Sequence, residues 1–209
     1  MKECGPNPTH RDQTAMNGAP GGGGGVQAAI RTVAVIGAGR LGRSFALACA
    51  AAGFDVVLED VMPANLRRAQ EEYADLASQN AGMRGRLAVA ATIEDAVREA
   101  DVAVDFVPDE LESKLEIFCM VDRMAPPKTM LLTPSEAQSI TDLASCTYRA
   151  ERCFAVRGGL TPGGTVRLLH PAGADHAELR AVDDFLRALG YKLRVELDGD
   201  APNLVKKLE

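Results

Sequence analysis

Three glycines with the spacing G-x-G-x-x-G indicate the most specific chemistry in this chain. Gly37, Gly39 and Gly42 directly follow the apolar run Thr32 to Ile36, and an alanine-rich helical pattern follows them. Gly37 permits a tight turn, Gly39 lets the backbone approach a pyrophosphate, and Gly42 lets helix and strand pack closely. The first amide groups of the helix then point at the phosphates. We therefore expect a dinucleotide-binding loop made of Gly37, Ala38, Gly39, Arg40, Leu41 and Gly42.

An acidic residue stands where the next strand pattern ends. Asp60 follows the run DVVLE, at about the distance of 20 residues from the loop that is typical of dinucleotide sites. A carboxylate there accepts both adenosine ribose hydroxyls and repels a 2′-phosphate, so the sequence favours NAD over NADP. If the strand ends one residue earlier, Glu59 takes this role. Arg40 would lie over a phosphate or the adenine.

Strand and helix patterns alternate along the chain and must position this loop. Their spacing suits βαβ crossovers, and the nearly continuous apolar runs of the strands indicate a sheet that is covered on both faces. We expect strands at 31–36, 55–59, 87–90, 101–107, 129–133, 153–157, 165–169 and 191–197, and helices at 41–52, 63–80, 92–99, 109–124, 136–144 and 175–189. The predicted fold class is α/β, a Rossmann-type doubly wound and mostly parallel sheet in a single domain. Its first six strands should be ordered 3-2-1-4-5-6 with right-handed crossovers.

Length and composition agree with one such domain and a tail. The 209 residues are 46% apolar, which is enough for one core. Residues 1–28 are rich in Gly and Pro and end in GGGGG, which predicts a flexible tail. Residues 29–200 form the predicted nucleotide-binding domain, and 201–209 a C-terminal tail.

The net charge and the cysteines of the chain limit the kinds of partner and the cellular location that we expect. A net charge of -6 argues against nucleic acid and anionic membrane surfaces. No apolar run has the length of a membrane span, and the N-terminus lacks the apolar core of a secretory signal. The five cysteines show no C-x-x-C spacing and the three histidines are scattered, so we expect reduced thiols and no metal site. The predicted location is cytoplasmic.

Beyond these features, the chain resembles the NAD-binding domain of L-3-hydroxyacyl-CoA dehydrogenases from about Arg31 to Asp200. VAVIGAGRLGRSFALACAAAGFDVVLED resembles the nucleotide motif of that family, and ADVAVDFVPDELESKLEIFCMVDRMAPP resembles its fourth strand and the helix that follows. LLTPSEAQSITDLA resembles the Ser-Asn-Thr-Ser-Ser segment of the family. The resemblance implies NAD as the cofactor. It also implies that the nicotinamide end of NAD lies near Val107, Pro108, Asp109 and Lys114. The alternative for Asp109 and Lys114 is a solvated helix N-terminus.

The segment FAVRGGLTPGG matches the part of the family that carries the catalytic histidine. Aligned without gaps this histidine becomes Arg157, and with one gap it becomes Gly158. Neither accepts a hydroxyl proton near pH 7. In the Ser-Asn-Thr-Ser-Ser segment, Pro134 replaces the Asn and Glu136 replaces the substrate-contacting Ser. We therefore expect cofactor binding to be retained and the usual reaction to be weakened.

Two residues remain as catalytic candidates. His170 aligns with the Glu that orients the family's histidine, and it could act as a replacement base. Arg157 could bind a substrate carboxylate or phosphate. The family's helical domain begins at about DAPNLVKKLE, so residues 201–209 are a tail or the start of this missing domain.

Two functions are compatible with this pattern. The first is an NAD-linked oxidoreductase of the 3-hydroxyacyl-CoA dehydrogenase type, with NAD(H) and an acyl-CoA or other anionic small molecule as ligands. The second is a non-catalytic NAD-binding sensor or scaffold module, in which the glycine-rich loop is an open contact surface.

Overall fold

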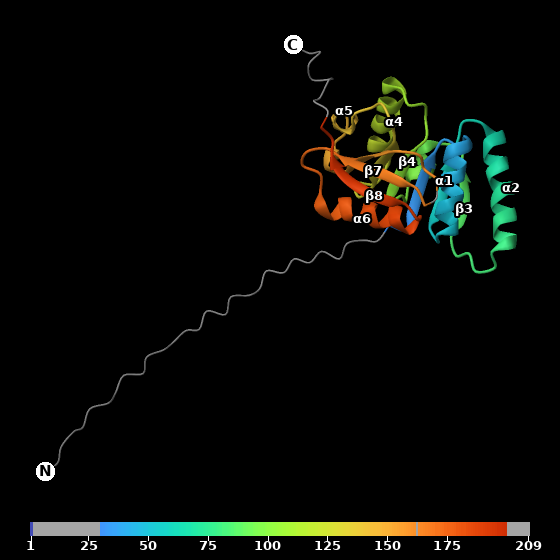
Figure 1. Ribbon diagram of the computed structural model, residues 1–209, viewed down its shortest axis with the longest axis horizontal. Coiled ribbons are helices and arrows are strands. Elements are labelled where there is room, and N and C mark those ends of the chain that lie inside the picture. Colours follow the sequence, from blue (N-terminus) through green and yellow to red (C-terminus); the bar gives the residue numbers. More distant parts are fainter. Residues whose placement is uncertain (2–29, 162, 200–209) are drawn as a thin grey trace.

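A computed structural model of the protein describes residues 1, 30–161 and 163–199 (Figure 1). The two tails expected at 1–28 and 201–209 lie outside these residues, apart from Met1. The described chain forms one eight-stranded sheet in the order β3-β2-β1-β4-β5-β6-β7-β8. The strands are β1 Thr32–Ile36, β2 Asp55–Glu59, β3 Arg86–Ala90, β4 Val102–Asp105, β5 Met130–Pro134, β6 Cys153–Arg157, β7 Thr165–His170 and β8 Lys192–Leu197.

The predicted fold class and the order of the first six strands are confirmed. All neighbouring strands pair in parallel except β6 and β7, which are antiparallel. The order of the sheet reverses between β1 and β4, because the chain returns there to build the second half. In sheets of this kind a ligand crevice opens beyond the carboxyl ends of the strands at the reversal.

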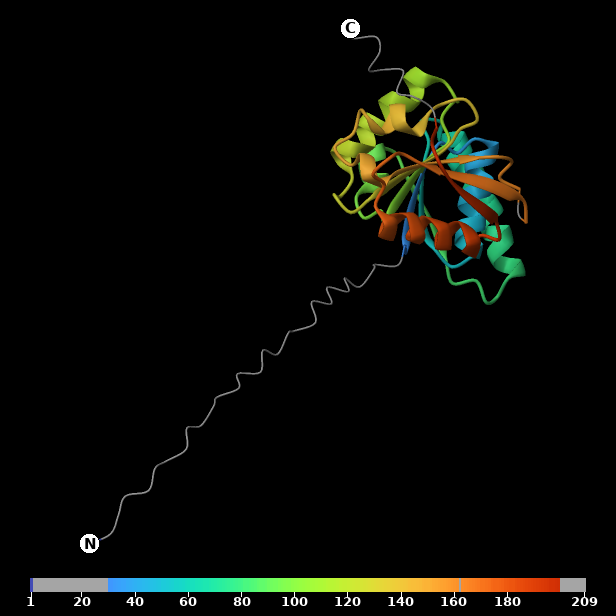
Figure 2. The same cartoon turned by 60° about the vertical axis from the view of Figure 1, so that its left-hand side comes forward.

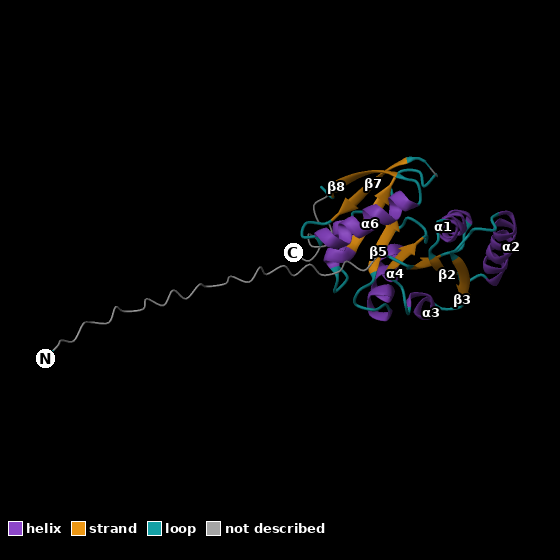
Figure 3. Cartoon of the chain, turned by 90° about the horizontal axis from the view of Figure 1, so that it is seen from below, coloured by secondary structure: helices purple, strands orange, loops and turns teal. Residues whose placement is uncertain are grey.

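Helices cover both faces of the sheet. Helices α1, α2 and α6 pack on one face, and α3, α4 and α5 on the other (Figures 2 and 3). Their bounds are α1 Arg40–Ala51, α2 Pro63–Gln79, α3 Ile93–Val97, α4 Leu111–Met124, α5 Ile140–Ala144 and α6 His176–Ala188. In the described part of the chain, no helix combines the length and the apolar character needed to cross a membrane.

Each face of the sheet has its own apolar core, because side chains of a strand alternate between the two faces. Val33 and Val35 of β1 pack with Phe45 and other residues on the α1 side. Ala34 and Ile36 of the same strand pack on the α4 side. This burial on both faces explains the nearly continuous apolar runs in the sequence.

The expected helix 136–144 is shorter than predicted and begins only at Ile140. Side chains hold the preceding backbone in a different conformation. The Asp109 carboxylate accepts the amides of Glu136 and Ala137, and the Ser139 hydroxyl caps α5 by accepting the Asp142 amide. The bonds to Asp109 hold two backbone amides outside a helix, and the Ser139 cap sets the start of α5. A short 3-10 helix at Ala150–Arg152 was not predicted.

A buried arginine fastens the end of α4 to the segment after α5. The Nε of Arg149 donates to Asp122 Oδ1 at 2.8 Å. Its two terminal nitrogens donate to four backbone carbonyls, those of Asp122, Ala125, Pro126 and Thr129. Both charged groups are largely buried, so each depends on the other to offset the cost of its desolvation.

Arg149→Met should therefore lower the free energy of unfolding by about 3–5 kcal/mol, because it leaves the Asp122 carboxylate buried without its partner. Urea denaturation measures the change. Arg123→Met is the matched control, since Arg123 is exposed on α4, next to Asp122. Such surface changes alter the free energy of unfolding by no more than about 0.5 kcal/mol. Equal losses in the two variants would contradict this role of Arg149.

Candidate functional site

A crevice lies beyond the carboxyl ends of the central strands, where the sheet order reverses. Loops that follow β1, β4, β5 and β6 meet there, although they are far apart in sequence. Its lining residues are Gly39, Arg40, Leu41, Gly42, Phe106, Val107, Pro108, Asp109, Pro134, Ser135, Glu136, Val156, Gly158, Gly159, Leu160 and Thr161. Gly158, Gly159, Leu160 and Thr161, which belong to the glycine-rich loop after β6, line the same crevice as the phosphate loop.

The three glycines of the phosphate loop are required for different reasons. Gly37 has φ +97°, a conformation that side chains rarely adopt. A Cβ on Gly42 would lie 1.9 Å from the carbonyl oxygen of Gly37, so this position admits no side chain without moving the backbone. A Cβ on Gly39 would meet no atom within 4 Å. The open space over Gly39, at the N-terminus of α1, fits a pyrophosphate.

Asp60 is held beside this loop. Its Oδ2 accepts the Ala38 amide at 2.6 Å, and its Oδ1 accepts the Met62 amide at 2.7 Å. Strand β2 ends at Glu59, whose side chain is buried. Burial, and then the neighbouring Asp60 charge, raises the pKa of Glu59. The structure thus favours Asp60 over Glu59 as the ribose ligand, and this role of Asp60 stays a prediction.

Sequence reasoning missed a residue that supports the loop from below. Arg43, buried in α1, donates to the Ala38 carbonyl at 3.2 Å and to Glu72 of α2 at 2.8 Å. Arg43 falls outside the glycine pattern. Its signal was an arginine on the inner face of an otherwise alanine-rich helix.

Asp109 joins two of the loops around the crevice. Its Oδ1 accepts the Ser135 hydroxyl at 2.6 Å, and its Oδ2 accepts the amides of Glu136 at 2.8 Å and Ala137 at 3.2 Å. Partial burial acts to raise the pKa of Asp109, but these three donors outweigh it and the pKa is lowered. Asp109 is therefore an acceptor that fixes the loop after β5, and it remains exposed directly before the N-cap residue of α4.

Lys114 lies beneath the crevice and does not line it. It is fully buried in α4, and its Nζ donates to Asp105 Oδ1 at 2.8 Å. Burial raises the pKa of Asp105, and the Lys114 charge offsets only part of this effect. The interpretation of Lys114 as a solvated residue is wrong. Its ammonium group is directed at Asp105 at the end of β4, two residues before Val107, and its expected position near the nicotinamide end stays a prediction.

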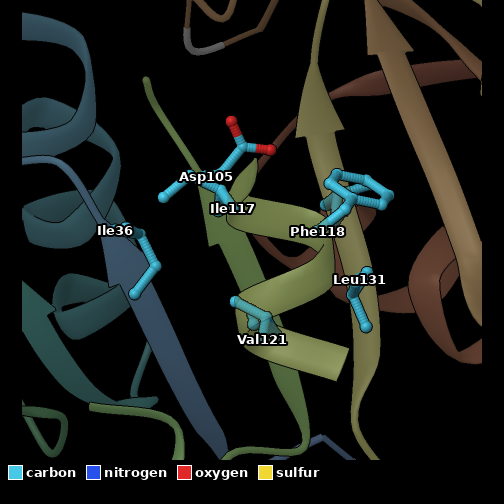
Figure 4. A pocket seen from close by; sticks show the side chains of 8 residues that line it. Ile36, Asp105, Ile117, Phe118, Val121 and Leu131 are labelled. Carbon is cyan, nitrogen blue, oxygen red and sulfur yellow. The ribbon is translucent and has the colours of Figure 1, made fainter. Parts of the chain in front are cut away.

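A small cavity lies next to this ion pair, between β1, β4, β5 and α4 (Figure 4). Asp105 lies at one end of it, and the other lining side chains are apolar. Ile36, Phe118, Val121 and Leu131 are among them. An apolar wall of this kind cannot solvate a carboxylate, so Asp105 depends on Lys114 for its charge.

Lys114→Met should destabilise the fold by about 3–5 kcal/mol, since it leaves Asp105 buried alone. The double variant Asp105→Leu, Lys114→Met removes both charges, and such replacements are about neutral or stabilising by about 1–4 kcal/mol. Urea denaturation of both variants gives the comparison. A double variant as unstable as the single one would show that the ion pair itself stabilises the fold.

The two expected catalytic candidates lie outside the crevice lining. Arg157 ends β6, and its Nη2 donates to the Gln138 carbonyl at 2.8 Å. The residue paired with Arg157 across the sheet is Arg167, and not His170. Because β7 runs antiparallel to β6, His170 at its end is turned away from the carboxyl ends of the parallel strands. His170 Nδ1 lies 3.1 Å from the Pro171 carbonyl. This placement contradicts His170 as the replacement base.

Glu136 makes a contact that the sequence did not indicate. Its Oε1 accepts the Gly158 amide at 2.5 Å, which joins the loops after β5 and β6 across the crevice. These two residues are 22 positions apart. The only signal in the sequence was an acid at the position of a substrate-contacting serine, close to a missing histidine.

Comparison with known proteins agrees with this site. The model of the 3-hydroxyacyl-CoA dehydrogenase, NAD binding domain, matches residues 32–158, more than half of the chain. A probable 3-hydroxybutyryl-CoA dehydrogenase of Bacillus subtilis is 31% identical over 61% of this chain and 48% of that protein. A 3-hydroxybutyryl-CoA dehydrogenase of Bradyrhizobium diazoefficiens is 28% identical over 82% of this chain and 62% of that protein.

Among solved structures, (S)-3-hydroxybutyryl-CoA dehydrogenase PaaH1 from Ralstonia eutropha superposes with a TM-score of 0.71 at 22% identity. The match covers 81% of this chain and 64% of that one, and at this identity it supports the fold alone. The chain thus spans about half to two thirds of the length of these relatives. From the family match, the glycine loop and the order of the sheet, the chain belongs to the 3-hydroxyacyl-CoA dehydrogenase family and contains its NAD-binding domain.

Proposed function

We propose that the protein is an NAD-dependent oxidoreductase that interconverts a 3-hydroxy and a 3-keto group on an acyl-CoA or a related anionic small molecule. The observation that carries this proposal is the crevice, which joins the phosphate loop to the loops after β4, β5 and β6. Bound NAD supplies the chemistry by accepting a hydride. The chain supplies the positions of cofactor and substrate.

Different residues along the crevice would contact different parts of the cofactor and substrate. Gly37 to Gly42 would hold the pyrophosphate, and Asp60 the adenosine ribose. Val107, Pro108 and Asp109 line the part that would receive the nicotinamide. The glycine-rich loop and Glu136 lie beyond them, where a substrate would enter.

One observation favours the second candidate, a non-catalytic NAD-binding sensor or scaffold. The cross-strand pair at the end of β6 is Arg157 with Arg167, and neither side chain can accept a proton near pH 7. We infer a cytoplasmic location with NAD(H) and small molecules as ligands, and the net charge of -6 argues against nucleic acid and anionic membrane surfaces as partners.

The role of Asp60 predicts a cofactor preference. The wild type should bind NAD more tightly than NADP, because each hydrogen bond to the ribose that involves the charged Asp60 is worth about 1.5–3 kcal/mol. Asp60→Ala should lower the ratio of the NAD affinity to the NADP affinity by at least about tenfold. Titration calorimetry with both cofactors measures it, and equal affinities in the wild type would disprove the assignment.

The second and third glycines of the loop, Gly39 and Gly42, distinguish an effect on binding from an effect on folding. Gly42→Ala should lower the melting temperature, because its Cβ would lie 1.9 Å from a backbone oxygen. Gly39→Ala should leave the melting temperature almost unchanged, since its Cβ meets no atom within 4 Å. It should nevertheless weaken NAD binding, because the methyl group fills the space for the pyrophosphate.

Two measurements test these variants: thermal unfolding in the absence of ligand, and titration with NAD. If Gly39→Ala bound NAD as tightly as the wild type, the pyrophosphate would not lie over this loop.

A further inference from the structure

Oxidation of a 3-hydroxy group requires an acceptor for the hydroxyl proton. The residues that replace the family's histidine do not supply one, since Arg157 stays protonated and Gly158 has no side chain. His170 lies toward the other end of the sheet. The acceptor must therefore come from the lining of the crevice itself.

Three side chains of that lining carry a titratable group: Arg40, Asp109 and Glu136. Arg40 remains a cation. The two oxygens of Asp109 already hold a hydroxyl and two amides, and these donors keep its pKa low. Glu136 differs from both. One of its oxygens accepts the Gly158 amide, and its Oε2 makes no hydrogen bond to the rest of the described chain.

The position of the Glu136 carboxylate also fits this role. Gly158 is the residue that stands in place of the histidine when the alignment has one gap, and Glu136 Oε1 lies 2.5 Å from its amide. The carboxylate therefore lies where β6 ends, among the residues of the crevice.

The backbone on both sides of this contact is held in place. The Glu136 amide donates to Asp109 at 2.8 Å. Gly158 has φ +110°, and a Cβ there would lie 3.3 Å from the Thr165 carbonyl oxygen. Glu136, which lines the crevice, thus extends from a fixed loop, and the Gly158 amide holds one of its oxygens.

We propose that Glu136 is the general base of this protein and replaces the missing histidine. The inference rests on the oxidoreductase function proposed above. The O–H bond of the substrate alcohol breaks and its proton passes to the Glu136 carboxylate. The electron pair of that bond forms the second carbon–oxygen bond. The C–H bond breaks with its electron pair and leaves as a hydride to NAD⁺, the oxidant. In the reverse direction the protonated Glu136 returns the proton to the ketone oxygen.

Glu136→Gln tests the proposal, because the amide keeps the shape and an oxygen for the Gly158 amide but cannot act as the base. With NAD⁺ and (S)-3-hydroxybutyryl-CoA as probes, kcat should fall about 100- to 10,000-fold. The melting temperature and the affinity for NADH should stay unchanged. Glu136→Asp should restore part of the rate. Glu116→Gln, the same substitution at an exposed position of α4, is the control and should keep the wild-type rate.

The outcomes separate the two proposals. If the wild type turns over and Glu136→Gln keeps its rate within about threefold, Glu136 is not the base and the oxidoreductase function stands. If Glu136→Gln loses rate only together with a lower melting temperature and weaker NADH binding, the contact is structural and the inference is overturned. If the wild type binds NADH but turns over neither this probe nor acetoacetyl-CoA, the oxidoreductase function fails and the inference with it.

Discussion

The hydrogen bonds that the Asp109 carboxylate accepts determine the shape of the crevice. They tie the loop after β5 to the loop after β4, so residues 135–138 cannot continue into α5 as the sequence pattern suggested. This loop in turn presents Glu136 to Gly158 and offers the Gln138 carbonyl to Arg157. The carboxylates of Asp109 and Glu136 thus connect the loops after three neighbouring strands, which would otherwise present unpaired backbone groups at the end of the sheet.

Several charged side chains near the crevice bind the protein itself. Arg43 and Arg157 donate to backbone carbonyls, and Lys114 donates to Asp105. Each lies under or behind a loop. A cation that is buried with its partner loses most of its freedom to move toward a ligand, because leaving would expose the partner's charge or carbonyl to an apolar surrounding. The lining of the crevice consists mainly of glycines and apolar side chains, and its two acids are Asp109 and Glu136.

The arrangement of these loops relates two departures from the family pattern to each other. Considered separately, the two replacements indicate a loss of catalytic function. One puts an arginine or a glycine in place of the histidine, and the other puts a glutamate in place of a serine. In the folded chain, the glutamate reaches the backbone of the residue that replaced the histidine. The two changes are therefore adjacent in space and can compensate each other.

The glycine loop, the following acid and the order of the sheet could be predicted from the sequence because they depend on local geometry. Gly37 is required by its own positive φ and Gly42 by its close approach to the carbonyl of Gly37, and the alternation of strand and helix restricts the topology through short right-handed crossovers. The burial of Lys114, the antiparallel turn that carries His170 away, and the contact between Glu136 and Gly158 could not be predicted in this way. They depend on the register between strands and on hydrogen bonds between residues far apart in sequence, which only the packing of the whole sheet decides.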